Sequence, residues 1–277
     1  MSTAGKDPHI KILMYHRVVD HPVGSDTNWF YVTSDQFKRQ MSLINRLGFT
    51  TITFIDYQLY LKGELSLPAK PIIITFDDGY LDTYDVATPI LLEFGMKAVV
   101  FVMGDRRHLR ASWDEAGDHD ICPLMSDDQF RTLRNYGFEI GAHSMNHSDL
   151  SSLTNREIFH EVDTSKREIE SVIGEPVHTF AYPYGRLDER VQKIVELAGF
   201  SFACGVFSGS PSFGKSVFDF RRIAINRNHS LAHVLIRLLT PFEHLEWLYY
   251  RFKMSIQRTE TPALHIPNHV NQADQDI

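Results

Sequence analysis

Two groups of side chains in this sequence could carry out metal-assisted hydrolysis: an adjacent pair of carboxylates and a spaced pair of histidines. Asp77 and Asp78 directly follow the apolar run PIIITF, and His143 and His147 lie four residues apart. Two adjacent carboxylates repel each other, so a cation or a proton must offset their charge. Two imidazoles and one carboxylate can hold a divalent metal with a position left open for an acidic water.

In such a site one aspartate would bind the metal and the other would stay free. A free carboxylate beside a metal-bound water acts as a general base. The predicted chemistry is hydrolysis of an amide or ester, in which the metal polarises the carbonyl oxygen. Each motif alone is also typical of ordinary structure, because Asp-Asp-Gly is common in turns and the chain has 14 histidines.

Position strengthens the prediction, because four polar clusters each lie where a predicted strand ends. The clusters are Tyr15-His16, Asp77-Asp78-Gly79, His143 with His147, and Tyr182-Pro183-Tyr184-Gly185. The corresponding strands are predicted over residues 10–15, 71–76, 138–142 and 178–182. In a (β/α) barrel the carboxyl ends of all strands lie on one face, which holds the active site. We therefore expect the four clusters to converge.

Apolar runs alternate with amphipathic stretches along the whole chain, which predicts parallel strands with right-handed crossovers. Further strands are expected at residues 50–54, 97–103, 200–206 and 223–226. Helix caps are predicted at Ser34, at Ser126 with Gln129, and at Thr154 with Glu157, with Gly174 ending the third helix. Seven or eight such units without a glycine-rich dinucleotide loop favour an α/β fold of (β/α)7-8 barrel type, a single domain over residues 9–240.

The end of the chain differs in character. The stretch PFEHLEWLYYRFKM has aromatic residues at helical spacing, which predicts an amphipathic helix over residues 241–258. Packing on the barrel exterior is the favoured interpretation of this helix, and peripheral contact with a membrane is the alternative. Residues 259–277 are polar and are expected to form a disordered tail.

Composition excludes several classes of protein. With 28 basic and 35 acidic residues and a net charge of −7, binding to nucleic acid is not expected. No segment reaches the roughly 18 apolar residues of a membrane span, and the N-terminus lacks the pattern of a signal peptide, so we expect a cytoplasmic location. Cys122 and Cys204 lie far apart, which excludes a disulfide framework and a zinc ribbon.

Three motifs together resemble a known family. TFDDGY at residues 75–80, HSMNH at 143–147 and AYPYG at 181–185 resemble the polysaccharide deacetylases with a NodB-homology domain, carbohydrate esterase family four. YHRV at residues 15–18 is also similar to bacterial members. The resemblance covers residues 9 to 235. It implies a distorted (β/α) barrel, a divalent metal (most often Zn²⁺, otherwise Co²⁺, Ni²⁺ or Mn²⁺), and removal of an acetyl group from an N-acetylated sugar.

The resemblance also implies roles for individual residues. Asp77 matches the general base, and the metal ligands are matched by Asp78, His143 and His147. The backbone N–H of Tyr184 matches the donor to the oxyanion of the tetrahedral intermediate.

The chain departs from the family pattern at the residue that orients the base. The family's third motif carries an arginine there, and Ala181 stands in its place. We hypothesise that Arg222, at the start of the last predicted strand, supplies the guanidinium from another direction. Arg221 is the less favoured choice.

A second departure concerns the general acid, which is usually the histidine of a late Leu-x-His motif. His233 matches this motif by letter but falls inside a predicted helix, and the nearby His229 is equally unanchored. We predict His16 as the acid, because it ends a strand on the correct face. The candidates for stacking on a sugar are Tyr80, Trp113 and Tyr184, and we expect at least one of them to be a packing residue.

The sequence therefore predicts a metal-dependent carbohydrate N-deacetylase whose partner is an N-acetylated amino sugar, polysaccharide or glycan intermediate, as in exopolysaccharide metabolism. One alternative is a related C–N hydrolase, a deformylase or amidase acting on a small or lipid-linked sugar. A second alternative is a catalytically impaired barrel that binds glycan in a polysaccharide-assembly system.

Overall fold

The computed structural model describes residues 10–22, 30–107, 110–111, 122–206 and 216–240. The chain divides into a compact unit over Met1–Pro241 and a second unit over Phe242–Ile277, and all described residues belong to the first. The predicted helix at 241–258, the predicted tail at 259–277 and Trp113 lie outside the described residues. Within those ranges, no helix has both the length and the apolar character needed to cross a bilayer.

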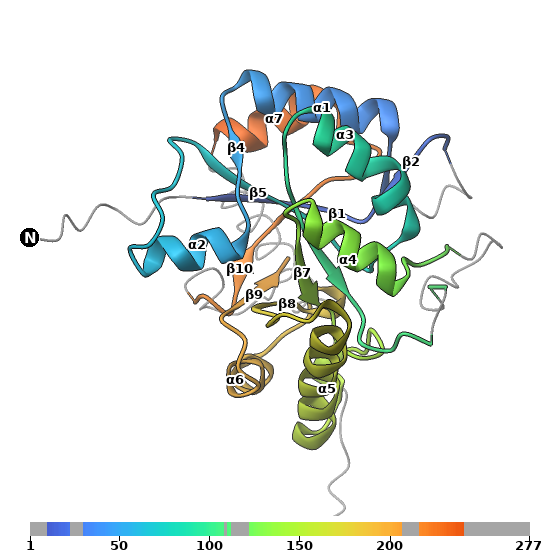
Figure 1. The fold of residues 1–277 in the computed structure, drawn as a ribbon, viewed down its shortest axis with the longest axis vertical. Helices are drawn as coiled ribbons and strands as arrows, with labels where there is room; N and C mark the ends of the chain where they lie inside the picture. Colours follow the sequence, from blue (N-terminus) through green and yellow to red (C-terminus); the bar gives the residue numbers. More distant parts are fainter. Residues whose placement is uncertain (1–9, 23–29, 108–109, 112–121, 207–215, 241–277) are drawn as a thin grey trace, which may run out of the picture. The chain divides into compact units, whose positions relative to one another are not determined.

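Parallel strands form the centre of the fold (Figure 1). They run across the sheet in the order β10, β9, β8, β7, β6, β5, β1, β11, and β4 also pairs with β5. The strands are β1 (Lys11–Tyr15), β4 (Thr50–Thr51), β5 (Pro71–Phe76), β6 (Val99–Val102), β7 (Glu139–Ala142), β8 (Thr179–Ala181), β9 (Phe202–Gly205), β10 (Phe220–Arg221) and β11 (Ile223–Ala224). A separate parallel pair consists of β2 (Arg17–Val19) and β3 (Tyr31–Thr33).

The two ends of the sheet are joined in the chain by a single residue, Arg222. β10 pairs with β9, and β11 pairs with β1 at the opposite end of the strand order. A one-residue connection between β10 and β11 therefore brings the two sheet ends together. The result is the predicted distorted (β/α) barrel, nearly closed and formed by eight strands, with two very short strands at its seam.

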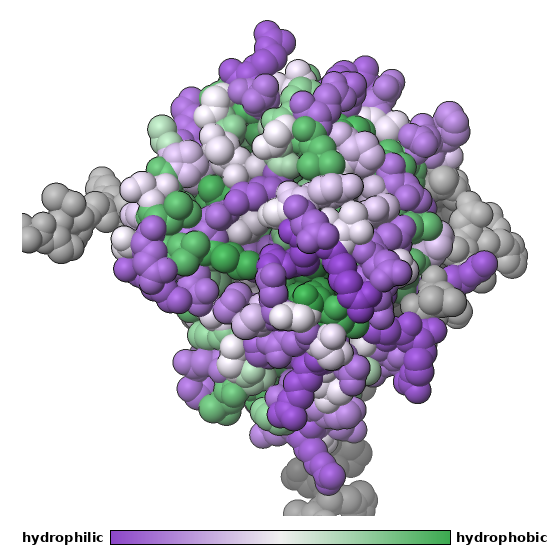
Figure 2. All heavy atoms as spheres, viewed as in Figure 1, coloured by the Kyte–Doolittle hydropathy of each residue, from purple (hydrophilic) through white to green (hydrophobic). Residues whose placement is uncertain are grey.

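Seven α-helices of the described residues connect the strands and surround them (Figure 1). They are α1 (Ser34–Arg46), α2 (Phe54–Leu61), α3 (Thr88–Glu93), α4 (Asp127–Asn135), α5 (Asn155–Ile173), α6 (Glu189–Leu197) and α7 (Leu231–Leu239). Shorter helical turns occur at Thr83–Ala87, Leu150–Ser152 and Pro183–Gly185. On the face shown in Figure 2, hydrophilic side chains cover much of the surface.

Local sequence signals set several helix ends as predicted. The capping boxes of Ser126 with Gln129 and of Thr154 with Glu157 are both present, at the starts of α4 and α5. Gly174 ends α5 in the left-handed conformation, with φ of 73°, which a residue without a Cβ adopts at little cost. These ends were predictable because the signals lie within four residues of each other.

Two predicted boundaries near the N-terminus were wrong. Thr33, and not Ser34, caps α1, because its side chain and that of Gln36 form the capping box. The strand predicted at residues 50–54 ends at Thr51, since Thr53 already caps α2. In both cases a second threonine or serine close by offered an equivalent signal in the sequence.

Side chains alternate between two hydrophobic clusters along the strands, as expected for buried parallel strands. The larger cluster, which includes Leu13 and Tyr15 of β1, packs under the surrounding helices. The smaller cluster contains strand residues, Ile52 and the start of α2, and therefore fills the inside of the barrel. Its buried members are Ile12, Ile52, Phe54, Tyr57, Ile73, Val99, Phe101, Ala181, Phe202 and Cys204.

A buried carboxyl group joins α2 to this inner cluster. Glu139 is 1% exposed, and it accepts hydrogen bonds from Thr179 Oγ1 (2.8 Å) and from the backbone N–H of Ile55 (3.0 Å). Burial raises the pKa of Glu139 to about 7, although the donors from Thr179 and from the start of α2 oppose this shift. The protein is therefore more stable when this carboxyl group is protonated.

We expect Glu139→Gln to change the pH dependence of stability. The pKa of Glu139 is higher in the folded chain than its unfolded value of 4.5, so its stabilising effect is complete below the unfolded value and is lost as pH rises through about 7. An amide can accept from Ile55 and donate to Thr179 at every pH. As pH rises from 5 to 8, the free energy of unfolding of the variant should therefore increase relative to that of wild type by on the order of 2 kcal/mol, measured by denaturant unfolding. Glu168→Gln, at an exposed position of α5, should show no such increase. A difference in unfolding free energy between Glu139→Gln and wild type that does not change with pH would contradict the raised pKa of Glu139.

Candidate metal centre and active site

The polar clusters predicted at strand ends do meet at one face of the barrel, which we call the barrel mouth. His16 follows β1, Asp77 and Asp78 follow β5, and His143 follows β7. Strand β5 pairs in parallel with β1 on one side and β6 on the other, and β6 pairs with β7. Because neighbouring parallel strands end at the same edge, these residues lie together although they are far apart in sequence.

Asp78, His143 and His147 converge on a common point. The Oδ1 atom of Asp78 lies 3.4 Å from Nε2 of His143 and 3.3 Å from Nε2 of His147. All three side chains are buried. Asp78 Oδ1 nevertheless has no hydrogen-bond partner among the described residues, so the three atoms approach one another without the geometry of hydrogen bonds.

The donor set fits a divalent cation. Ligand atoms about 2.0–2.2 Å from zinc lie about 3.3–3.6 Å apart around a tetrahedron, which agrees with both distances to Asp78 Oδ1. The Nδ1 atom of His143 lies 2.8 Å from the carbonyl oxygen of Ala181. This contact places the ring proton on Nδ1 and leaves the Nε2 lone pair for a metal, as is usual for ligating histidines.

The backbone at Asp78 separates the two adjacent carboxylates. Asp78 has a left-handed φ of 72° and Gly79 one of 70°. This conformation is uncommon for a residue with a Cβ and persists where surrounding contacts enforce it. Burial favours the protonated form of Asp78, but His143 and His147 at its oxygen outweigh burial and hold the pKa of Asp78 well below its usual value. Asp78 is therefore available as an anionic ligand.

Asp77 is bound by Arg222, in the pairing predicted from the sequence. The Nη1 and Nη2 atoms of Arg222 donate to the two carboxylate oxygens of Asp77 at 2.6 and 2.8 Å. Arg222 is 3% exposed, and its guanidinium lies 5.4 Å from the centre of the Phe101 ring. Burial alone would raise the pKa of Asp77, but Arg222, with smaller contributions from His143 and His16, lowers it. Asp77 therefore stays ionised although it is buried.

His16, the residue predicted as general acid, follows β1 and lies beside Asp77. Tyr15 pairs with Phe76 in the sheet, and the N–H of Asp77 donates to the carbonyl of Tyr15 at 3.0 Å, so His16 is the next residue along β1. Its ring lies 4.9 Å from that of Phe30. Its buried Nδ1 atom has no hydrogen-bond partner in the described part of the chain, and its ring is close enough to both aspartates to influence their pKa values.

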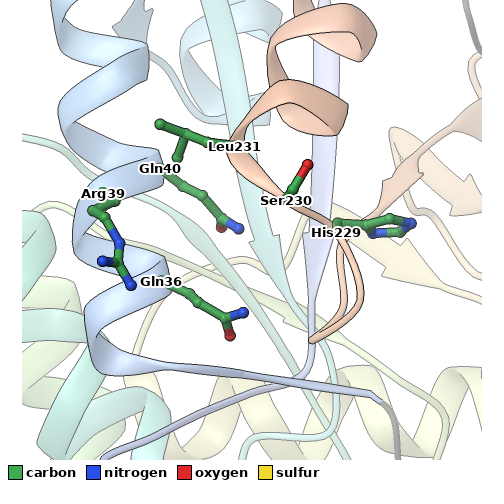
Figure 3. A pocket seen from close by; sticks show the side chains of 6 residues that line it. All are labelled: Gln36, Arg39, Gln40, His229, Ser230 and Leu231. Atoms are coloured by element: carbon green, nitrogen blue, oxygen red, sulfur yellow. The ribbon is translucent and has the colours of Figure 1, made fainter.

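The histidines set aside in the sequence analysis lie elsewhere. His233 is part of the capping box of α7, with Ser230. His229 accepts a hydrogen bond from the N–H of Asn226 through Nδ1 at 3.1 Å. Figure 3 shows His229 at the edge of a pocket of about 200 Å³ between α1 and α7. The pocket is lined by Gln36, Arg39, Gln40, His229, Ser230 and Leu231, none of which is a residue predicted for the active site.

The three aromatic residues predicted to contact a sugar have different positions. Tyr184 is 55% exposed, and its ring centre lies 4.6 Å from that of His147, so it borders the barrel mouth. Tyr80 is 2% exposed and packs in a small cluster with Met103 and Leu124. This burial leaves no ring face for a sugar and makes Tyr80 a packing residue. Trp113 lies outside the described residues.

Sequence reasoning missed two contributors to the site. The carbonyl group of Ala181 holds His143, and a backbone group leaves no signal in the residue type. Glu161 binds the turn between the two histidines. The signal for Glu161 was its spacing, because it falls three residues after Ile158, on the buried side of α5, where a glutamate needs a partner.

Comparison with known proteins decides the family. A sequence profile described as "Polysaccharide deacetylase" matches residues 65–203, half of the chain. This chain belongs to the polysaccharide deacetylase family. The matched region contains Asp77, Asp78, His143 and His147, whereas His16 and Arg222 lie outside it.

Relatives agree with membership of the polysaccharide deacetylases. YxkH of Bacillus subtilis, which carries a provisional polysaccharide deacetylase name, is 26% identical over 225 residues, 80% of this chain and 73% of its own length. A poly-beta-1,6-N-acetyl-D-glucosamine N-deacetylase of Staphylococcus aureus is 22% identical over 182 residues, 62% of this chain and 60% of its own. The fold is similar to that of the deacetylase PplD of Streptococcus pyogenes, solved in complex with acetate. That match has a TM-score of 0.69 at 23% identity and covers 84% of this chain and 98% of PplD.

We expect Arg222→Leu to destabilise this polysaccharide deacetylase by about 3–5 kcal/mol at pH 8, because it leaves the Asp77 carboxylate buried without its partner. In wild type the lowered pKa of Asp77 stabilises the fold above the ordinary Asp value near 4, and this contribution is lost as pH falls through the folded value. Without Arg222, burial raises the pKa of Asp77, so the loss should be smaller at pH 5. Denaturant unfolding measures the destabilisation at both pH values. The double variant Arg222→Leu, Asp77→Asn should regain most of the lost stability. Equal destabilisation in single and double variants would contradict this account.

Proposed function

We propose that this chain is a metal-dependent N-deacetylase that removes the acetyl group from an N-acetylated amino sugar in a polysaccharide or glycan intermediate. One observation carries the proposal. Asp78 Oδ1 lies 3.3–3.4 Å from the Nε2 atoms of two imidazoles, the spacing of ligands that share one metal, and the neighbouring Asp77 is paired with Arg222 instead. A carboxylate that can bind a metal and a second, ionised carboxylate beside it suit metal-assisted hydrolysis of an amide, in which the second one acts as general base.

Each proton transfer of the proposed reaction is assigned to a residue of this chain. When a divalent cation is held by Asp78, His143 and His147, it supplies a Lewis acid for the amide carbonyl and lowers the pKa of a water molecule. Asp77 takes the proton from the attacking water, since Arg222 keeps its carboxylate ionised. We assign the other end of the reaction to His16, which donates a proton to the leaving nitrogen of the sugar.

Substrate contacts come from the β8 side of the mouth. We assign the N–H of Tyr184 to the developing oxyanion and its exposed ring to one face of the sugar. Tyr184 has a left-handed φ of 58° directly after Pro183, in a sharp turn beside the metal ligand His147. A strained turn of this kind is common where backbone groups face a reacting atom.

The alternative functions have less support. A barrel that only binds glycan would not need Asp77, because a buried carboxylate and guanidinium that do no chemistry carry a desolvation cost. A deformylase or amidase would use the same cluster with another acyl group. The name of the Staphylococcus aureus relative supports poly-beta-1,6-N-acetyl-D-glucosamine as the first substrate to test, and the cytoplasmic location stays a prediction.

The primary test is release of acetate from N-acetylglucosamine oligomers by the purified full chain. We expect acetate release that is abolished by a chelator and restored by Zn²⁺, with Co²⁺, Ni²⁺ and Mn²⁺ as further candidates. Formate or ammonia from other substrates, without acetate, would instead support the related C–N hydrolase. A chain that binds metal and glycan but turns over neither class of substrate would support the impaired barrel.

Replacing the two aspartates separately should separate metal binding from proton transfer. We expect Asp77→Asn to retain metal and lose turnover by 10²-fold or more, the lower end of general-base contributions. Asp78→Asn should lose metal affinity. Metal content measured by elemental analysis, alongside acetate release, distinguishes the two, and full turnover by Asp77→Asn would rule out its role as base.

The general acid should be visible in the pH–rate profile. If His16 donates the proton, activity falls at high pH as its ring loses the proton, which gives an alkaline limb. We expect His16→Ala to lower kcat and to remove that limb, with metal content unchanged. An alkaline limb of full strength in His16→Ala would exclude this histidine as the acid.

A further inference from the structure

The turn between the two metal-site histidines has a backbone that must be held in place. Ser144 and His147 both have left-handed φ values, 61° and 56°. Residues with a Cβ disfavour this conformation, and it persists where neighbouring contacts over-determine it. The coil of this turn is also what allows two imidazoles four residues apart to reach one oxygen of Asp78.

One side of the turn is held by the loop that follows β6. The N–H groups of Gly104 and Asp105 donate to the carbonyl oxygens of Ser144 and Met145, at 3.0 and 2.9 Å. A Cβ on Gly104 would lie 2.5 Å from the Cα of Ser165 in α5. Position 104 therefore admits no side chain, and the turn, the loop and α5 are in close contact.

The other side of the turn is held by one carboxylate of α5. Glu161 Oε2 accepts from the backbone N–H groups of Met145 and Asn146, at 3.0 and 2.9 Å. Its Oε1 accepts from the side-chain amide of Asn146 at 2.7 Å. Glu161 is 7% exposed, so these charge-assisted bonds form largely away from water, where they are strong.

We propose that Glu161 is a positioning residue for the metal centre, an inference that rests on the proposed function. Glu161 contacts residues 145 and 146, between the two ligands, and not the ligand atoms themselves. With three hydrogen bonds from the rigid helix α5 it fixes the turn, and the turn fixes where the two Nε2 atoms point. Partners of this kind, one step removed from the metal, commonly change metal affinity 10- to 100-fold when they are replaced.

The chain offers a matched control in the same pocket. Glu161 lies at the edge of a pocket of about 420 Å³ that Ser148, Leu153, Arg156, Glu157 and His160 also line. Glu157 is one turn earlier on α5, but its carboxylate accepts from Thr154 in the helix cap. Replacing Glu157 therefore changes charge and helix stability in the same place without touching the turn.

The experiment compares Zn²⁺ affinity of the full chain and its variants by competition with a chromophoric chelator. We expect Glu161→Ala to weaken binding 10- to 100-fold, and Glu157→Ala to stay within twofold of wild type. Glu161→Gln should recover most of the affinity, because its amide oxygen can accept from both backbone N–H groups. The side-chain amide of Asn146 can rotate so that its oxygen accepts from the new glutamine N–H. Amide hydrogen exchange at residues 145 and 146, in metal-free chains, should accelerate in Glu161→Ala and not in Glu157→Ala.

Should Glu161→Ala fail to fold, Asn146→Ala serves in its place, because it removes one of the three bonds at an exposed position. It should weaken Zn²⁺ binding severalfold. Wild-type Zn²⁺ affinity in Glu161→Ala would overturn the positioning role, as would wild-type affinity in Asn146→Ala where Glu161→Ala does not fold. An equal loss of affinity in Glu157→Ala would also overturn it. Each of these results would leave the proposed function intact. A wild-type chain that does not bind Zn²⁺, Co²⁺, Ni²⁺ or Mn²⁺ would overturn the proposed function itself.

Discussion

A carboxylate and a guanidinium, those of Asp77 and Arg222, meet inside the barrel almost completely shielded from water. Removing two charges from solvent is costly, and only close, two-point contact offsets that cost. The contact ties the end of β5 to the seam between β10 and β11, where the sheet closes. It also keeps Asp77 anionic at a place where burial alone would protonate it. Both the closure of the fold and the charge of the candidate base therefore depend on the same pair.

The mouth of the barrel resolves the repulsion between two adjacent aspartates by giving each its own counter-charge. Asp77 faces a permanent cation of the protein, whereas Asp78 faces two imidazoles that can share a metal with it. The left-handed backbone at Asp78 lets successive side chains point to different partners. The same conformation recurs at Ser144, His147 and Tyr184, so all four left-handed residues with side chains among the described residues lie around one site.

The parts of this structure that could be predicted are those with signals in adjacent residues. The run PIIITF gave β5 with both ends correct, and its position before Asp77 placed the site at strand carboxyl ends. Strands of two or three residues, such as β2, β3 and β10, are too short to show a period. Arg222 was predicted as a substitute for the arginine missing at Ala181. Its location at the seam could not be predicted, because the pairing of β11 with β1 is visible only in the folded chain. Glu161 was missed because only the folded turn shows what it binds.

The seam at Arg222 has a consequence for how the protein is made. The partners of the ion pair are separated by 145 positions in the chain, so the contact can form only after nearly all of the barrel has been synthesised. Contacts between distant parts of a chain generally form late, because closing a long loop costs entropy first. Before Arg222 has been synthesised, the Asp77 carboxylate can stay ionised only in contact with water. Asp77 can therefore be enclosed as an anion only once the chain has reached the seam that brings its guanidinium partner.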